Sequence, residues 1–130
     1  MTAESYESVL TALCLWREAR GEPREAKRGV LWVIRNRAQD HAHRWPLSPV
    51  QVILQSAQFS SFSSGDPNAV KFPKPDDPSW LECCSVVDDP GEDPTGGANH
   101  YHSLAGPHSV WWAQGEQPSA HVGRLWFFQL

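Results

Sequence analysis

A chain of 130 residues, 40% of them hydrophobic and seven of them tryptophan, has the length and apolar content of a single domain spanning residues 1–130. Its formal net charge of −4 provides no basic surface of the kind that nucleic-acid binding needs, which excludes nucleic acid as a partner. The longest apolar run, GVLWVI, is far shorter than the roughly 20 residues that cross a bilayer, so stable membrane insertion is excluded as well.

The first two elements are predicted to be helices that meet at the segment REARGEPREA, residues 17–26. Apolar residues recur at helical spacing over residues 4–20, and Gly21 is a typical stop signal. Pro23 lies just beyond it, and a second apolar stripe continues to about residue 37. The charged segment is therefore expected at a helix–helix junction.

Two further helices are predicted from capping signals. Ser48 and Gln51 flank Pro49 with the spacing of a capping box, which predicts a short helix to about residue 57. In PSWLECCSVVD, Ser79 and Glu82 have the same spacing.

The remaining chain indicates loops and a small β element. Residues 58–77 are rich in Ser, Pro, Gly and Asp and are long for a connector, which is typical of a functional loop. A short strand is expected around ANHYHS, and HVGRLWFFQL reads as a terminal strand or buried tail. The predicted fold class is therefore α+β and mainly α.

Glu18 occupies a position where helical geometry predicts contact with the interior. Leu10, Cys14 and Glu18 follow one another at intervals of four residues, so the carboxyl group continues the apolar stripe. Loss of water around a carboxyl group raises its pKa, and so does the negative end of a helix dipole. We therefore expect Glu18 to act as a general acid near neutral pH.

Glu22 has a different predicted environment. It lies past Gly21 at the start of the second helix, where a negative charge is favoured, so its carboxylate is expected to stay ionised. Arg20 can pair with either glutamate or cover the turn. The alternative is a charged surface corner in which both glutamates are solvated, and the spacing alone leaves both interpretations open.

Four segments in order along the chain carry a resemblance to a known family. EARGEPREAKRGVLWVIRNRA, PLSPVQVILQSAQFSSF, DPTGGANHYH and VGRLWFF together resemble the SleB-like cell wall hydrolases, which include spore-cortex-lytic enzymes and bacterial and phage lysins. The resemblance covers about residues 8–128. It implies a lysozyme-like fold of the lytic-transglycosylase type, and it assigns the family's catalytic acid to Glu18.

The chain departs from the family pattern at two places. Ala26 and Lys27 stand where the family commonly has Gly and Gln, and Leu125 and Trp126 stand where it often has His and Phe. We expect altered packing at these positions. Neither departure involves the E-A-R-G-E motif itself.

The activity that the resemblance implies is cleavage of peptidoglycan between N-acetylmuramic acid and N-acetylglucosamine. Glu18 would protonate the oxygen of the β-1,4 bond as it breaks. The sequence identifies no second carboxylate, because Glu22 is expected to face another way. A single acid favours a lytic transglycosylase, in which the carboxylate next takes a proton from the C6 hydroxyl and a 1,6-anhydro ring closes. A hydrolytic muramidase, such as a phage endolysin, is the alternative.

Substrate-binding residues are predicted in two loop segments. Gln58 and Ser60 offer an amide and a hydroxyl to an N-acetyl group, and Phe59 offers a ring to its methyl group, although Phe59 suits the core equally well. Thr95 opens the glycine-rich TGGANHYH, in which backbone can approach a ligand closely. Tyr101 presents an amphipathic ring and a hydroxyl to a sugar.

The histidines leave a metal site open as a hypothesis. His100 and His102 lie on the same side of an extended segment and His108 is nearby, as a zinc amidase would require. No H-E-x-x-H motif and no acidic ligand at a recognisable spacing accompany them, so we expect no metal and no other cofactor. One histidine is expected to hydrogen-bond the substrate or Tyr101, and His102 is the candidate.

Tryptophans are candidate stacking platforms for sugar rings, namely Trp45, Trp111 and Trp112. Adjacent residues of a strand face opposite ways, so one of Trp111 and Trp112 is expected to be partly exposed at a cleft. Packing in the core is the alternative for each.

The sequence thus predicts a peptidoglycan-cleaving enzyme that acts as a monomer on glycan strands. A non-catalytic glycan-binding module is an alternative that the retention of Glu18 argues against. The N-terminal segment MTAESYESVL has two acids and no basic residue, so it does not resemble a secretory signal. We expect synthesis in the cytoplasm and action on the wall after release, for example through a holin lesion.

Overall fold

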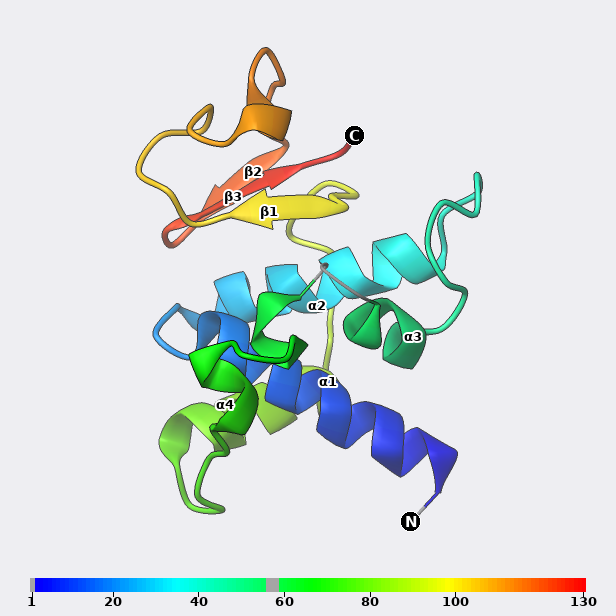
Figure 1. Cartoon of the computed structure of the whole chain (residues 1–130), viewed down its shortest axis with the longest axis vertical. Coiled ribbons are helices and arrows are strands. Elements are labelled where there is room, and N and C mark those ends of the chain that lie inside the picture. Colours follow the sequence, from blue (N-terminus) through cyan, green and yellow to red (C-terminus); the bar gives the residue numbers. More distant parts are fainter. Residues whose placement is uncertain (1, 56–58) are drawn as a thin grey trace.

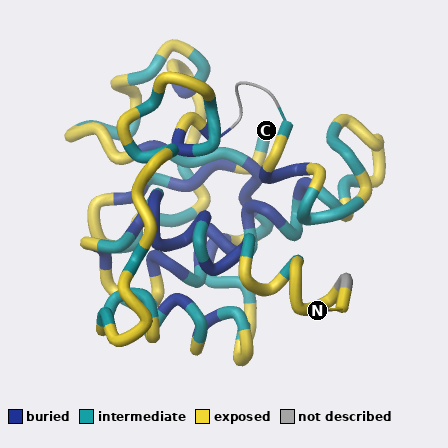
Figure 2. The backbone as a smooth tube through the Cα atoms, turned by 60° about the horizontal axis from the view of Figure 1, so that its bottom comes forward, coloured by how far each residue is buried: buried dark blue, intermediate teal, exposed yellow. Residues whose placement is uncertain are grey.

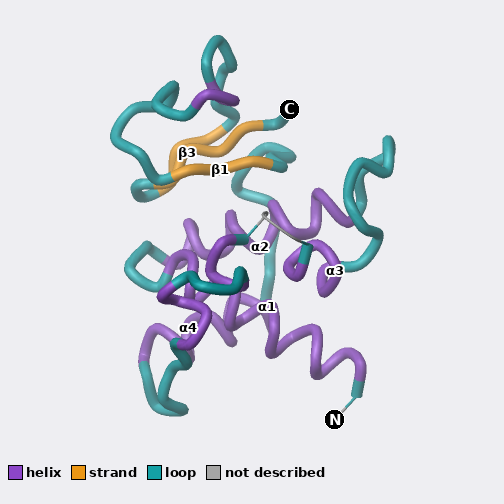
Figure 3. The backbone as a smooth tube through the Cα atoms, in the orientation of Figure 1, coloured by secondary structure: helices purple, strands orange, loops and turns teal. Residues whose placement is uncertain are grey.

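Helices come first along the chain and strands last, and the two kinds of element form separate layers (Figure 1). The structure, a computed structural model, describes residues 2–55 and 59–130. Its helices are α1 (Ala3–Ala19), α2 (Arg24–Ala38), α3 (Pro49–Leu54) and α4 (Pro78–Asp88). Its strands are β1 (His100–His102), β2 (Ala120–Val122) and β3 (Leu125–Phe128). The sheet caps one side of the helical layer, which confirms the α+β, mainly α class (Figure 3).

Helices α1 and α2 have the bounds that their apolar stripes predict. The hydroxyl of Thr2 accepts a hydrogen bond from the backbone N of Ser5 (3.0 Å) and caps the start of α1. After α1 the chain turns, with the backbone N of Glu22 bonded to the carbonyl of Ala19 (2.9 Å), and Pro23 leads into α2. Within residues 2–55 and 59–130, no helix has both the length and the apolar character needed to cross a membrane.

The caps of the shorter helices agree with one expectation and correct another. The hydroxyl of Ser48 accepts from the backbone N of Gln51 (3.2 Å), as predicted, but α3 ends at Leu54, earlier than expected. The capping box of α4 was wrong, because the carboxylate of Asp77 caps this helix by accepting from the backbone N of Ser79 (2.8 Å). Proline favours the first helical position, so α4 begins at Pro78.

The long loop between α3 and α4 has local structure of its own. It contains two short 3-10 helices, η1 (Ser60–Phe62) and η2 (Pro67–Val70). The carboxylate of Asp66 caps η2 by accepting from the backbone N of Asn68 (2.8 Å). The described part of this loop, residues 59–77, is therefore folded and packs against α1 through η1.

The antiparallel sheet has the strand order β1-β3-β2. The predicted strand around ANHYHS is confirmed as β1, whereas the C-terminal segment forms the hairpin β2–β3 instead of a single strand. The hairpin turns at Gly123, whose φ is +58°. A Cβ atom there would lie only 2.6 Å from Oε1 of Glu22, so both backbone angle and space demand glycine.

One close contact places the sheet on the helices. Phe127 of β3 is fully buried and lies against Gly29 of α2, where an added Cβ atom would come within 2.4 Å of the ring. The same face of the sheet carries Tyr101, which is the partner of Phe127 in the β1–β3 register. The buried backbone, dark blue in Figure 2, runs through the centre of the molecule where these layers meet.

Candidate active site

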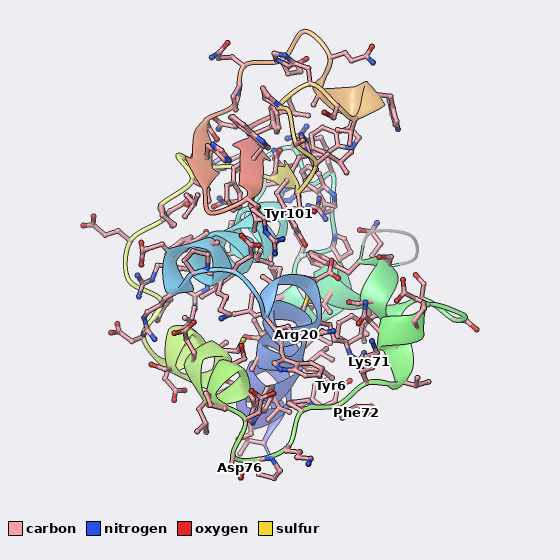
Figure 4. All side chains as sticks on the ribbon, turned by 90° about the vertical axis from the view of Figure 1, so that its left-hand side faces the viewer. Tyr6, Arg20, Lys71, Phe72, Asp76 and Tyr101 are labelled. Atoms are coloured by element: carbon pink, nitrogen blue, oxygen red, sulfur yellow. The ribbon has the colours of Figure 1, made fainter. Side chains whose placement is uncertain are left out.

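Glu18 and Tyr101 meet where the sheet covers the end of α1. Glu18 lies in the last turn of α1 and is half-buried, next to the apolar stripe that contains the fully buried Cys14. The hydroxyl of Tyr101, from the middle of β1, donates a hydrogen bond to Oε1 of Glu18 (3.0 Å). Figure 4 looks onto this face, with Tyr101 descending from the sheet towards the helix end that carries Arg20.

The environment of Tyr101 keeps its hydroxyl protonated. Burial of the hydroxyl, followed by the nearby charge of Glu18, raises the pKa of Tyr101 well above its ordinary value. A phenol in this state donates a hydrogen bond to the Glu18 carboxyl group. Two of the predicted site residues, far apart in sequence, are therefore brought into direct contact.

Glu22 is buried and holds the β2–β3 turn. Its Oε1 accepts from the backbone N of Arg124 (2.8 Å), and its Oε2 accepts from Nε of Arg124 (2.7 Å). Burial alone would raise the pKa of Glu22, but these two hydrogen bonds and the charges of Arg124 and Lys27 outweigh it and lower the pKa. Glu22 is thus ionised, as expected, and it joins the helix junction to the sheet.

Arg20 covers the turn and forms no ion pair with either glutamate among the described residues. Its Nη1 donates to the carbonyl of Trp16 (3.3 Å), and its Nη2 donates to Oδ1 of Asn68 (3.2 Å) in η2. The guanidinium group also lies 4.5 Å from the centre of the Trp16 ring. Of the two roles open to Arg20, the structure has the second.

Arg17 is a residue of this region that the sequence reasoning missed. It is 7% exposed and donates to three backbone carbonyls of the loop, those of Ser61 (3.3 Å), Ala69 (3.2 Å) and Lys71 (3.1 Å). The rings of Phe62 and Phe72 lie 4.7 and 4.8 Å from its guanidinium carbon. Arg17 therefore ties the loop to α1 beside Glu18.

A signal for Arg17 was present in the sequence. Leu10, Leu13 and Arg17 are spaced by three and four residues, so Arg17 lies on the same helical stripe as Glu18. A basic side chain in that position needs buried acceptors, and backbone carbonyls supply them here.

The predicted residues of the QFS segment have different surroundings. Gln58 lies outside the described residues. Phe59 belongs to the core at 2% exposure, with the guanidinium carbon of Arg37 5.5 Å from its ring centre. Ser60 is exposed at the start of η1, where its hydroxyl is accessible from the solvent.

Thr95 is fully buried and uses its hydroxyl inside its own loop. Its Oγ1 donates to Oδ1 of Asp93 (2.6 Å) and accepts from the backbone N of Ala98 (3.1 Å). Burial would raise the pKa of Asp93, but hydrogen bonds from Thr95, from Asn36 and from the backbone lower it. Thr95 thus organises the glycine-rich loop and leaves no surface to a ligand.

His102 lies on the face of the sheet opposite Tyr101. Its Nδ1 accepts from the backbone N of Leu104 (3.1 Å), so the other ring nitrogen, Nε2, donates to the carbonyl of Pro107 (2.9 Å). His100 shares this face, as the alternation of a strand predicts, and burial lowers the pKa of His100 to about 4. Both nitrogens of His102 are bound to backbone, and this does not suit a metal ligand.

The remaining candidate metal ligands are the other His, Cys, Asp and Glu side chains. Among residues 2–55 and 59–130, no three His, Cys, Asp or Glu side chains lie close enough together to hold a metal ion. The ring nitrogen Nε2 of His108, the third histidine of the hypothesis, is bonded to the carbonyl of Glu116 (2.9 Å).

The adjacent tryptophans lie on a short 3-10 helix, η3 (Trp111–Ala113), and not on a strand. Trp111 is 83% exposed, whereas Trp112 packs against His100 and His102 with ring-centre distances of 5.1 and 5.6 Å. One of the pair is thus exposed, as expected. Its neighbour Trp112 lies on the face of the sheet that carries His100 and His102, opposite Tyr101.

The arrangement of the helical layer and the three-stranded sheet is shared with solved catalytic domains. The backbone superposes on the catalytic domain of the germination-specific lytic transglycosylase SleB from Bacillus anthracis with a TM-score of 0.73 at 21% identity, over 99% of this chain and 97% of that one. The catalytic domain of the Bacillus cereus SleB protein gives 0.73 at 22% identity, over 96% and 91%. The fold is lysozyme-like, as the sequence resemblance implied.

A match to a family model identifies the family of the chain. The cell wall hydrolase model matches residues 21–128, and the chain therefore belongs to the cell wall hydrolase family of peptidoglycan-degrading enzymes. No curated protein matches it significantly. The matched segment begins three residues after Glu18, so the assignment of the acid depends on the geometry of the α1 end and not on this match.

Proposed function

We propose that this enzyme cleaves the β-1,4 bond between N-acetylmuramic acid and N-acetylglucosamine as a lytic transglycosylase, with Glu18 acting first as acid and then as base. Membership of the cell wall hydrolase family supports the substrate. The structural likeness to a catalytic domain described as a lytic transglycosylase supports the reaction type. The observation that carries the proposal is the hydrogen bond between Tyr101 and Glu18.

This hydrogen bond divides the work between the two carboxyl oxygens. Oε1 accepts from Tyr101, and Oε2 has no hydrogen-bond partner in the described part of the chain, so Oε2 is the oxygen that carries the proton to the substrate. Once the proton has left, Tyr101 stabilises the carboxylate through a charge-assisted hydrogen bond. The raised pKa of Tyr101 ensures that this hydroxyl still donates.

The state of Glu22 favours a single-acid mechanism. Glycosidases with two carboxylates use the second to attack the sugar or to activate water. Both oxygens of Glu22 are bound to Arg124, so Glu22 is not available for this task. The carboxylate of Glu18 then takes the proton of the C6 hydroxyl, the C6 oxygen bonds to C1, and a 1,6-anhydro ring forms without consuming water.

Substrate-positioning roles follow for the neighbouring segments. The loop that Arg17 holds beside Glu18 carries the exposed Ser60, which we assign with Gln58 to an N-acetyl group. Arg20 supports the loop through Asn68. Action as a monomer and release to the wall through a membrane lesion stay predictions.

The test is replacement of the acid by its amide. Glu18→Gln keeps size and removes the transferable proton, so lysis of purified peptidoglycan should fall at least about a hundredfold. Glu25→Gln is the matched control, because Glu25 is exposed on α2 and pairs only with Arg28 among the described residues. Circular dichroism and a melting curve would verify that both variants fold.

Mass spectrometry of the products separates the candidate reactions. Fragments ending in 1,6-anhydromuramic acid support the transglycosylase. Fragments with reducing muramic acid ends indicate the hydrolytic muramidase, and free peptides indicate an amidase. An active Glu18→Gln variant would refute the assignment of the acid.

A further inference from the structure

A cavity opens on the outer face of the sheet, next to the hairpin that Glu22 holds. Its volume is about 410 Å³, within the range of small-ligand pockets. The turn 103–105, which follows β1, forms one side. His121, Gly123, Arg124 and Trp126 form the other side, and we call this space the hairpin cavity.

The hairpin cavity has an aromatic and apolar wall. His121 and Trp126 are register partners in β2 and β3, and their rings stack with centres 3.5 Å apart and planes 9° apart. Leu104 is 49% exposed on the opposite side. Tyr101 and its partner Phe127 lie on the face of the sheet that contacts the core. Trp126 and its partner His102 are one residue away in their strands, so they lie on the opposite face, and the cavity is on that outer face.

Arg124 lines the hairpin cavity and reaches towards the end of α1 that carries Glu18. Its side chain is 77% exposed, and Glu22 holds its backbone N and its Nε. A Cβ atom built on Gly21 would lie 3.6 Å from Nη2, so the tip of the guanidinium group passes over Gly21, three residues after Glu18. No hydrogen bond to Nη1 or Nη2 is found in the described part of the chain, and no acidic side chain lines the cavity there.

We propose that the hairpin cavity binds the acidic peptide stem that a muramic acid residue of the glycan strand carries, with Arg124 binding a stem carboxylate. This inference rests on the proposed function. A guanidinium group fits a carboxylate with two parallel hydrogen bonds. The N-acetylated sugars are uncharged once their lactyl groups are linked to peptide, so the stems supply the carboxylates along the strand. The stacked rings and Leu104 take the apolar part of the stem.

The test compares two polymers, intact glycan strands and strands stripped of their stems by an amidase. Arg124→Gln should reduce the preference in kcat/KM for the intact strands about tenfold, mainly through KM. Glu25→Gln is the control, because Glu25 is exposed on α2 and does not line the hairpin cavity, so it should affect both polymers alike. Equal effects of Arg124→Gln on the two polymers would overturn the proposal.

A second variant avoids the structural role of Arg124. Leu104→Glu places a negative charge at the exposed edge of the hairpin cavity without touching the Glu22–Arg124 pair, and it should lower the same preference. An unchanged preference in Leu104→Glu would also count against the proposal.

Binding of the free stem peptide gives a readout that needs no turnover. Added to the Glu18→Gln protein, it should shift the NMR signals of the 103–105 amides and of the Trp126 indole. The shifts should disappear with Arg124→Gln. If neither polymer is cleaved by the wild-type protein, the proposed function fails, whereas absent shifts at the cavity refute the stem site alone.

Discussion

The hydroxyl of Tyr101 donates a hydrogen bond to Oε1 of Glu18 at 3.0 Å, although the two residues are 83 positions apart in the chain. The bond joins the last turn of α1 to the central residue of β1, and so links the helical layer to the sheet. We propose that Tyr101 positions Glu18 through this bond, whereas the sequence suggested a sugar contact for the same side chain. The two roles have different kinetic signatures.

Tyr101→Phe should lower kcat about tenfold and leave KM close to the wild-type value, because the ring stays against Phe127 and only the hydroxyl is lost. Steady-state kinetics on soluble glycan fragments would measure both constants. A rise in KM at constant kcat would instead identify Tyr101 as a substrate contact. The melting temperature should change little, since one hydrogen bond contributes about 1 kcal/mol.

Arg17→Met should release the loop that carries η1 and η2. Methionine fills the apolar part of the site but makes none of the three hydrogen bonds to loop carbonyls, so we expect the free energy of unfolding to fall by about 2–4 kcal/mol. Amide hydrogen exchange in residues 59–72 should quicken more than exchange in α2.

The conservative variant of the same residue separates charge from shape. Arg17→Lys keeps the positive charge, but an ammonium group lacks the planar surface that the guanidinium group presents to the rings of Phe62 and Phe72. It should recover only part of the protection. Full recovery would mean that charge alone holds the loop.

Gly29→Ala should destabilise the fold by about 1–3 kcal/mol, even though alanine is the better helix former by about 1 kcal/mol. The added methyl group would collide with the ring of Phe127, at 2.4 Å. Denaturant unfolding would measure the loss. In a double-mutant cycle, Phe127→Leu should offset part of the cost of Gly29→Ala, and strictly additive effects would contradict the proposed contact.

Glu22→Gln should remove a pH-dependent contribution to stability. The pKa of Glu22 is lowered in the folded state, so its contribution is present above about pH 4.3 and is lost as the pH falls through the lowered value. At pH 7 the variant should be less stable by about 1–3 kcal/mol, and the difference should shrink in acid. Lysis should fall less than in Glu18→Gln, and equal losses would mean that the roles of the two glutamates are wrongly divided.

Local signals in the sequence predicted most of the secondary structure. Apolar spacing predicted α1 and α2, and the same period placed Glu18 on the inward stripe of its helix. These inferences succeed because helical spacing and capping depend on residues within one or two turns. The start of α4 was misjudged because Asp77 and Ser79 both suit a cap, and Pro78 favours the earlier one.

The candidate site residues in loops were harder to judge from the sequence. Thr95 and Phe59 belong to segments that suggest ligand contact, yet both are buried, Thr95 in a hydrogen-bonded loop and Phe59 in the core. Composition indicates that a loop exists. It does not indicate which of its side chains turn inward, because the surrounding elements decide this.

By itself, the sequence determined the class of fold, the order of helices and strands, and the position of an acid at a helix end. Only the tertiary structure decided what that acid contacts: Tyr101 for Glu18, and Arg124 for Glu22 across 102 positions. The physical reason is that helical and strand periods are set by neighbouring residues, whereas these partners depend on how the sheet sits on the helices. The packing of Phe127 against Gly29 helps to set that placement, and no local sequence pattern predicts this contact.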